Sequence, residues 1–434
     1  MNFITHWKKL AAAVAAAATL AAPLAAEAHW LSSRQEKEIG NQAVRDFMNE
    51  YQTEHSWLLE HIQKRIMLFN SDKLWMYGTP GKKRGLEPVL LAKIDRANAV
   101  SYGGGQIFIN EGYLAQLANK EANHFYYDKS EQNPWKKCYI YQMSALAAVM
   151  GHEMGHWENE DMLRQHDRQM DTRLLASLIP VGNVWALLGV AAGTNLINAF
   201  NSRDMGFKTE QQADEKAMEY SMYVPEYSVG GEAIVEYRAY QYKLTQGIED
   251  EVKNWLHPHS KTAKRLERAL RYQEELSNGF IKWDGFSPIF NGTTKCGSAF
   301  LYSPAKQNFD AVERGFYVVG QIATAIHFDF CKTRFLKVMQ ENEVFTDGSP
   351  NNVVLLLEGR GNDRQDHTKI IDTYYNVSMK DAKWWAESPW EVIEPKYHEI
   401  IKHDSELANL AYTRGIIEQY ESNRAKYRFK KTDD

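Results

Sequence analysis

The chain has 434 residues, and its 51 Lys and Arg against 56 Asp and Glu give a formal net charge of −5. A weakly acidic chain argues against nucleic acid as the main partner. The length suits one large core or two domains, and three cysteines are too few for a disulfide-rich scaffold.

Residues 1–28 have the pattern of a cleaved signal peptide. Lys8 and Lys9 precede an Ala- and Leu-rich run that ends near Leu24, and Ala26-Glu27-Ala28 fits a small-x-small cleavage site. A transmembrane anchor is the alternative, but the apolar run is short and dominated by alanine. The mature chain is therefore predicted to be periplasmic or secreted.

The following region is predicted to be mostly helical. The apolar pattern predicts a helix over 35–67, a strand element near 99–110 and a helix over 112–121. Glycines permit close backbone approach, and an open strand edge can pair with an extended peptide. Substrate binding is therefore predicted at Gly104, Gly105, Gln106 and Ile107. A phosphate loop is the competing interpretation, but neither G-x-G-x-x-G nor G-K-[ST] follows.

An H-E-x-x-H motif lies in the next predicted helix, over 142–165. The preceding run is rich in Ala, Leu and Met, which favours a buried helix. His152 and His156 are four residues apart, so they share one helix face and can bind one metal ion. Glu153 lies beside them and can act as general base on a metal-bound water. The acidic residues after His156 suggest that the helix then emerges into solvent.

A long uncharged stretch, Leu174–Asn201, follows the motif. Its length alone permits a membrane span. Pro180 and several Gly and Asn residues interrupt it, however, so we expect a buried helical hairpin against the catalytic helices. A surface that dips into a bilayer and a true span are the alternatives.

A catalytic zinc site needs a third protein ligand and one open position. Glu210 begins an E-x-x-A-D segment and a predicted helix that runs to Tyr223. We predict Glu210 as the third ligand. Asp214 lies one turn later on the same face, where it can orient a zinc-bound imidazole by accepting its hydrogen bond. One Zn²⁺ per chain is expected.

These motifs resemble the HtpX and CAAX-prenyl-protease group of zinc metallopeptidases, which are gluzincins, and especially its soluble periplasmic, BepA-like members. In this chain the gap between Ser202-Arg203 and Glu210 is longer than is usual in the group. Three other segments match family landmarks: Ser33–Gly40, Asn98–Ile109, and His257-Pro258 with Arg265-Leu266. The resemblance implies an α-dominated α+β fold, with a gluzincin domain and a small β-strand element at residues 29–276.

The resemblance also places His257 and Arg265 near the cleft, as candidate catalytic residues beside Glu153. His257 could stabilise the oxyanion of a tetrahedral intermediate. It could instead occupy the open zinc position and hold the enzyme inactive, or merely cap a helix ahead of Pro258. Arg265 is expected to pair with a carboxylate near the site.

The composition changes after this region. Gly, Asn and Ser are frequent over 277–297, which predicts a linker. Residues 298–434 are predicted to form a mixed α/β accessory module of unknown role. Within it, β-branched and aromatic residues predict strands over 316–330, 352–358 and 369–377, and a helix closes the chain over 406–427.

An exported chain of this kind can form one disulfide, for which Cys296 and Cys331 are the candidate pair. Cys296 and Cys331 both lie in the C-terminal part, which leaves Cys138 as a lone thiol. Three reduced, buried cysteines are the equally weighted alternative.

Together these features predict an exported zinc-dependent endopeptidase. The resemblance implies substrates among extended or misfolded segments of envelope proteins, so polypeptides are the expected partners. Contact with a membrane surface through Leu174–Asn201 is an additional expectation. A chaperone-like or binding protein of the envelope with a latent zinc site is the alternative, and the large unassigned module favours it. A lipid-facing hydrolase would depend on Leu174–Asn201 alone.

Overall fold

The computed structural model describes residues 32–117, 140–164, 167, 207–245, 262–291, 311–330, 332–337, 353–374, 377–400 and 402–428. These residues form mainly helices with three small sheets, so the predicted α-dominated α+β fold class is confirmed. The predicted signal peptide, Leu174–Asn201, His257 and the three cysteines lie outside the described residues. Within the ranges given above, no helix combines the length and apolar character that a membrane span requires.

Two helices, α2 (Ser33–Glu50) and α3 (Trp57–Phe69), stand where the pattern predicts one helix over 35–67. The single-helix prediction is wrong because the backbone turns extended at Tyr51, with φ −125° and ψ 139°. The chain then forms the short strand β1 (Thr53–His55), which pairs with a segment far along the sequence. This pairing is non-local, so the local apolar period does not reveal it.

The N-terminal sheet contains four strands in the order β1-β2-β4-β3. Strand β2 (Leu90–Ala92) runs parallel to β4 (Gln106–Asn110), and β3 (Ala99–Tyr102) is antiparallel to β4. The strand element predicted near 99–110 is therefore a hairpin. Its turn contains Gly104 and Gly105, whose positive φ values of 84° and 88° favour glycine.

Strand β4 pairs with β3 along Gln106–Ile109 and with β2 along Phe108–Asn110. Ahead of β2, the Glu87 amide donates to the Gly105 carbonyl at 2.9 Å and Gln106 Nε2 donates to the Pro88 carbonyl at 2.8 Å, so this side of the strand is covered as well. The predicted open edge at Gln106 and Ile107 is therefore wrong. Gly104 and Gly105 also lie against other segments of the chain rather than against solvent. Lys37 Nζ donates to the Gly104 carbonyl at 3.0 Å, and a Cβ on Gly105 would lie 2.1 Å from the Gly85 carbonyl oxygen. Among the described strands of this sheet, β3 and β1 are the edges.

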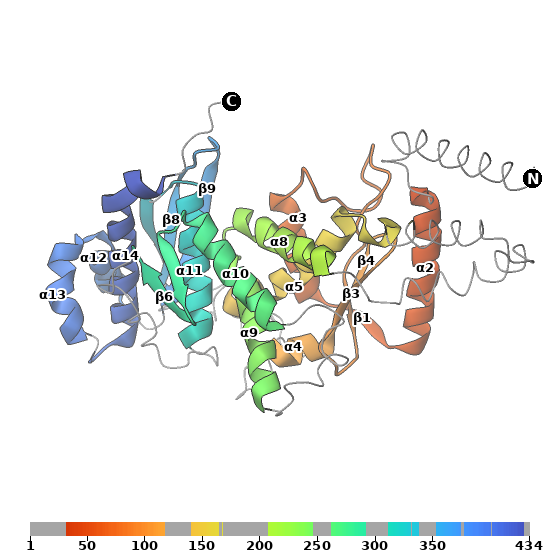
Figure 1. The fold of residues 1–434 in the computed structure, drawn as a ribbon, viewed down its shortest axis with the longest axis horizontal. Helices are drawn as coiled ribbons and strands as arrows, with labels where there is room; N and C mark the ends of the chain where they lie inside the picture. The colour runs from red at the N-terminus through yellow and green to blue at the C-terminus, as the bar shows by residue number, and fades with distance from the viewer. Residues whose placement is uncertain are drawn as a thin grey trace, which may run out of the picture.

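Helix α5 lies at the centre of the helical layer (Figure 1). It spans Ile140–Glu158 and is buried along almost its whole length. Helices α8 (Phe207–Tyr223) and α9 (Gly230–Thr245) pack against it, and α10 (Thr262–Leu276) packs on α9. The helix predicted from Glu210 to Tyr223 is confirmed by α8. Between β4 and α5, α4 (Glu111–Leu117) begins one residue before its predicted start.

The residues after α10 correct one prediction. Strands β5 (Ile281–Asp284) and β6 (Ser287–Phe290) form a hairpin within the range of the predicted linker. Helix α11 (Ala311–His327) stands where a strand over 316–330 is predicted. That prediction is wrong because α11 is buried from Glu313 to Ile326, and the β-branched and aromatic residues there suit a buried strand as well as a buried helix.

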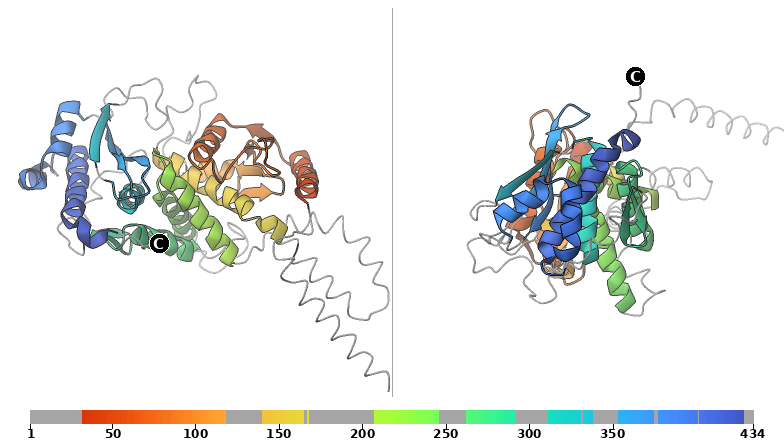
Figure 2. Two further views of the ribbon diagram at one scale, coloured as in Figure 1. Left: turned by 90° about the horizontal axis from the view of Figure 1, so that it is seen from above. Right: turned by 90° about the vertical axis from the view of Figure 1, so that its left-hand side faces the viewer.

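Strands β7 (Lys332–Lys337), β8 (Val353–Arg360) and β9 (Asp366–Tyr374) form an antiparallel sheet. The strands predicted over 352–358 and 369–377 are thus confirmed, apart from their ends. The closing helix is confirmed by α14 (Ser405–Tyr427), and two shorter helices, α12 (Met379–Glu387) and α13 (Trp390–Ile400), pack on it. Figure 2 shows α14 beside this sheet, at the opposite end of the molecule from α2.

One continuous apolar cluster runs from Leu58 in α3 to Tyr427 in α14. Helix α11 lies within it and packs on both α9 and β9. The C-terminal elements therefore share a core with the helices around α5. The predicted domain boundaries at 276 and 298 stay a prediction.

Candidate metal centre

Helix α5 presents two imidazole rings to one point. The Nε2 atoms of His152 and His156 lie 3.0 Å apart, and the rings are nearly perpendicular, at 89°. Both side chains are buried, with exposures of 5% and 3%. Their spacing of four residues places them on one helix face, as the sequence predicts.

Helix α8 can supply a third ligand because it approaches α5 at backbone contact. A Cβ added to Gly151 would lie 3.0 Å from the Ala217 Cα, and one added to Gly155 would lie 3.2 Å from the Ala213 Cα. Two glycines four residues apart thus face two alanines four residues apart. The crossing brings Glu210, in the first turn of α8, against both histidines.

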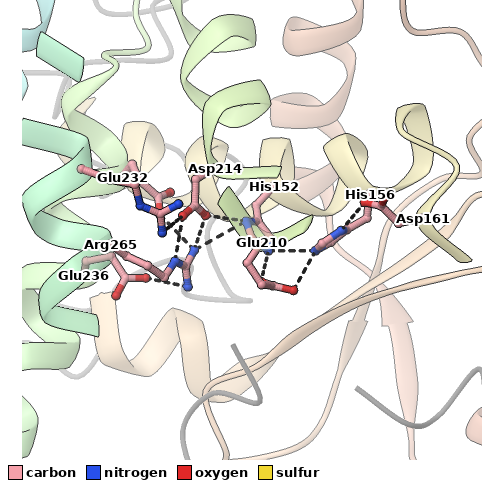
Figure 3. Close-up of polar contacts among 9 residues, drawn as sticks. His152, His156, Asp161, Glu210, Asp214, Glu232, Glu236 and Arg265 are labelled. Atoms are coloured by element: carbon pink, nitrogen blue, oxygen red, sulfur yellow. Dashed lines mark hydrogen bonds and ion pairs between the residues drawn. The ribbon is translucent and has the colours of Figure 1, made fainter. Parts of the chain in front are cut away.

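The carboxylate of Glu210 completes a compact group of donors (Figure 3). Its Oε2 is 3.3 Å from His152 Nε2, and its Oε1 is 3.6 Å from His156 Nε2. In the part of the chain that the structure describes, these three residues are the one group of this kind able to hold a metal ion. Two ligands at usual zinc distances in a tetrahedral site lie roughly 3.3 Å apart. The spacing of the donors therefore fits a zinc ion.

Each imidazole is oriented by its own carboxylate. His152 Nδ1 lies 2.8 Å from Asp214 Oδ1, and His156 Nδ1 lies 2.9 Å from Asp161 Oδ2. The position of Asp214 agrees with the sequence prediction. When both Nδ1 atoms donate to these carboxylates, both Nε2 lone pairs point toward the Glu210 carboxylate. Electron pairs that converge on one point in this way favour the binding of a cation there.

Asp161 is a site residue that the sequence reasoning missed. Helix α5 ends at Glu158 rather than continuing to Gln165, and Glu160 adopts a left-handed conformation with φ 57°. That turn brings Asp161 back to His156, where it is only 5% exposed. The acidic run after the motif is therefore not simply solvent-exposed. The acidic composition of this run is the one sequence feature that could have indicated a carboxylate near His156.

Charges in the site are strongly coupled. Burial alone would lower the pKa of His152, but the carboxylates of Asp214 and Glu210 outweigh it and raise this pKa well above its usual value. Burial opposes ionisation of Asp214, yet the Arg265 guanidinium and His152 lower the pKa of its carboxyl. Binding of a metal cation at this place therefore displaces a proton from His152.

Arg265, in α10, joins the site to α9. Its Nη2 donates to Asp214 Oδ1 at 2.6 Å and to Glu232 Oε1 at 3.0 Å, and its Nη1 lies 2.8 Å from Glu236 Oε1. The expected carboxylate partner is thus Asp214, and the sequence reasoning missed Glu232 and Glu236. Burial and the Asp214 charge raise the pKa of Glu232 to about 8, against the lowering effect of Arg265.

Glu153 lines a small cavity next to the ligands. The cavity has a volume of about 20 Å³, and its other lining residues include Asn98, Ala99, Tyr113 and His152. That volume accommodates about one water molecule. A buried carboxylate beside such a space, adjacent to His152, is placed to exchange a proton with a water or a substrate group.

A helix that carries H-E-x-x-H, packed on a second helix that supplies a buried carboxylate, is the architecture of a metallopeptidase site. Residues 76–273 match the model of peptidase family M48. This match confirms, at the level of the family, the resemblance stated from the sequence. The matched residues include the three donors His152, His156 and Glu210. They also include Glu153, Asp161, Asp214 and Arg265. No curated protein shows detectable sequence similarity to the chain.

Proposed function

We propose that this protein is an exported, zinc-dependent endopeptidase. The match of residues 76–273 to family M48 implies metallopeptidase activity. The observation that supports zinc best is the convergence of His152, His156 and Glu210, each imidazole being held by a carboxylate on its far side. Two histidines and a carboxylate, with a second carboxylate orienting each imidazole, are typical of catalytic zinc sites and support the proposal.

The chemistry of the proposed reaction divides between the metal and the protein. Zinc, when bound, lowers the pKa of a coordinated water and polarises a carbonyl group. Glu153 accepts the proton of the attacking water and later returns it to the leaving amine. Asp214 and Asp161 hold the two imidazoles in the tautomer that leaves Nε2 as the ligand atom.

The proposed substrate is an extended polypeptide segment that pairs with the edge strand β3. Ala99 of this strand lines the same small cavity as Glu153. A peptide added along β3 would form main-chain hydrogen bonds irrespective of its sequence, which suits a protease for unfolded segments. Substrates in the cell envelope, and export itself, are proposed from the family resemblance and from the pattern of residues 1–28.

The deciding experiment combines metal content with hydrolysis of an unfolded reporter protein. We expect purified wild type to hold about one zinc per chain. Glu153→Gln should keep the fold and the metal but lose hydrolysis, because an amide cannot accept the proton. His156→Ala and Glu210→Ala should lose most of the metal.

Glu215→Gln, on an exposed position of α8, is the matched control and should change neither property. Hydrolysis by Glu153→Gln at nearly the wild-type rate would remove Glu153 as the base. Full zinc retention in Glu210→Ala would remove this residue from the ligands. Binding of the unfolded reporter without cleavage by wild type would instead support the chaperone-like alternative.

A further inference from the structure

Strand β9 contains a buried lysine whose ammonium is surrounded by main-chain oxygens. Lys369 is 1% exposed. Its Nζ lies near four carbonyl oxygens: those of Ser221 at 3.1 Å, Met222 at 3.2 Å, Val224 at 2.7 Å and Tyr227 at 2.8 Å. All four belong to the last turn of α8 or to the connection between α8 and α9, which comprises residues 224–229.

The position of this ammonium matches the electrostatics of a helix end. The last carbonyls of a helix have no partner within the helix, and they carry the negative end of its dipole. Burial lowers the pKa of Lys369 to about 7, although the Glu226 carboxylate opposes this shift. A buried ammonium is costly unless acceptors surround it, and the carbonyls of α8 and of the connection at residues 224–229 provide them.

Other C-terminal groups hold the same connection. The Ile370 amide donates to the Pro225 carbonyl at 2.9 Å, so β9 also binds the connection through its backbone. From α11, the Tyr317 hydroxyl lies between the Glu226 carbonyl, at 3.1 Å, and the Ile370 carbonyl of β9, at 2.9 Å, and Gln321 Nε2 donates to the Pro225 carbonyl at 3.1 Å. The end of α8 is thus fixed by two C-terminal elements.

The same strand also reaches α5. The pairing of β8 with β9 shifts between Leu355 and Leu356, which leaves Ile371 as an extra residue in β9. An extra residue changes the alternation of side chains along a strand. Asp372 therefore points toward α5, where it accepts a hydrogen bond from the Tyr141 hydroxyl, and its other oxygen accepts from Arg314 Nε at 2.8 Å.

We infer that Lys369 is a positioning residue for the metal centre: it fixes α8 along its axis against α5, so that Glu210 stays between His152 and His156. This inference rests on the proposed metal site and gives the C-terminal module a role in it. Glu210 lies eleven residues before Ser221, about 16 Å along the helix. The Gly151 and Gly155 contacts set how closely the helices approach, while Lys369 sets the position of α8 along α5. Metal–ligand distances tolerate only about 0.2 Å, so even a small slide weakens binding.

The test measures the zinc dissociation constant by competition with a chromophoric chelator. It needs no peptidase activity. Lys369→Met should remain folded by circular dichroism yet bind zinc about tenfold more weakly. Tyr317→Phe removes only one hydroxyl from the same connection and should have a smaller effect in the same direction. Lys396→Met, an exposed lysine of α13, should bind zinc like wild type.

A second control separates positioning from simple loss of stability. Leu410→Ala removes a fully buried side chain from α14. It should lower the melting temperature without changing the zinc dissociation constant. Equal zinc affinity in Lys369→Met and wild type overturns the inference. If Lys369→Met does not fold, unchanged affinity in folded Tyr317→Phe overturns it instead. A wild type that binds zinc but cleaves no peptide would refute the proposed activity and leave the inference standing.

Discussion

At the scale of single residues, the two histidines are supported unequally. The Asp214 carboxylate accepts a hydrogen bond from His152 Nδ1. It also accepts hydrogen bonds from two guanidinium nitrogens of Arg265, Nε and Nη2. Asp161 meets His156 from the first residue of the helical segment that follows the left-handed residue Glu160. Removal of Asp214 would leave the buried Arg265 charge with less compensation, whereas removal of Asp161 changes mainly the histidine. Asp161 is therefore the better position at which to measure what an orienting carboxylate contributes.

Asp161→Ala should weaken zinc binding by roughly 10- to 100-fold, the usual cost of losing a hydrogen-bond partner of a metal ligand. The fold should persist, because the ligands themselves remain on α5 and α8. Chelator competition measures the change, and Glu215→Ala on α8 serves as a surface control. Zinc affinity equal to wild type would show that His156 needs no carboxylate to hold its orientation.

Glu232→Gln should change how stability depends on pH. The pKa of Glu232 is raised to about 8 in the folded chain, mainly by burial, whereas an unfolded glutamate has a pKa of about 4.3. The folded state thus holds a proton that the unfolded state releases between these values. Its contribution to the free energy of unfolding is complete below the lower pKa and is lost as pH rises through the upper one.

The Gln variant lacks this proton linkage but keeps a similar shape beside Arg265. Its stability relative to wild type should therefore increase from about pH 5 to about pH 9. Urea denaturation of the metal-free proteins at several pH values measures the difference. Parallel pH profiles for the two proteins would contradict the raised pKa of Glu232.

At the scale of elements, the contact between α5 and α8 depends on small side chains. A Cβ on Gly155 would lie 2.9 Å from the Lys216 Cβ and 3.2 Å from the Ala213 Cα. Because one of these atoms is backbone, the two helices would have to move apart. Glu210 would then move away from both histidines at once.

Gly155→Ala should therefore destabilise the protein by about 1–3 kcal/mol, the usual cost of overpacking a core. Alanine in place of a helical glycine gains at most about 1 kcal/mol in helix propensity, so the steric cost prevails. Chemical denaturation should show a lower free energy of unfolding, and zinc titration should show a weaker affinity. A variant more stable than wild type, with full zinc affinity, would show that the helices can separate without harm.

The parts of the site that the sequence predicts are those with helical periodicity. His152 and His156 share a face at spacing four, and so do Glu210 and Asp214. Asp161 could not be placed in this way, because its position depends on one residue with positive φ. Glu232, Glu236 and Arg265 meet only through the packing of α9 and α10. The local sequence does not indicate that Arg265 lies close to Glu232 and Glu236.

The fold follows the same division between local and non-local information. The helices α8 and α14 and the strands β8 and β9 have patterns of their own, and they are found where predicted. Helix α11 is buried on every side, so its residues resemble those of a buried strand. The break between α2 and α3 depends on the pairing of β1 with β2. These failures occur where tertiary contact outweighs local preference.

At the scale of the whole molecule, the apolar core crosses the predicted domain boundary. The cluster that includes α5, α8 and α9 continues through α11 into α14. Two domains with separate cores would unfold independently, but a shared core transmits the loss of packing throughout. We therefore expect cooperative unfolding of the chain as one unit.

Differential scanning calorimetry of the full protein should show a single transition, with a calorimetric enthalpy close to the van't Hoff value. Zinc should raise the temperature of that whole transition, because it binds only the folded state. Two resolved transitions, of which only one responds to zinc, would contradict a shared core and favour the division into an enzyme domain and a separate module.

The glycine at the fourth position of the metal motif has a consequence for interpreting such motifs in other chains. In this protein the residue before the second histidine determines whether another helix can come within backbone contact. A glycine there lets a neighbouring helix come close enough for its glutamate to reach the ion. A bulky side chain would exclude that helix and require a remaining ligand with longer reach or from another direction. The five-residue motif thus indicates how closely a helix outside the motif can pack against it.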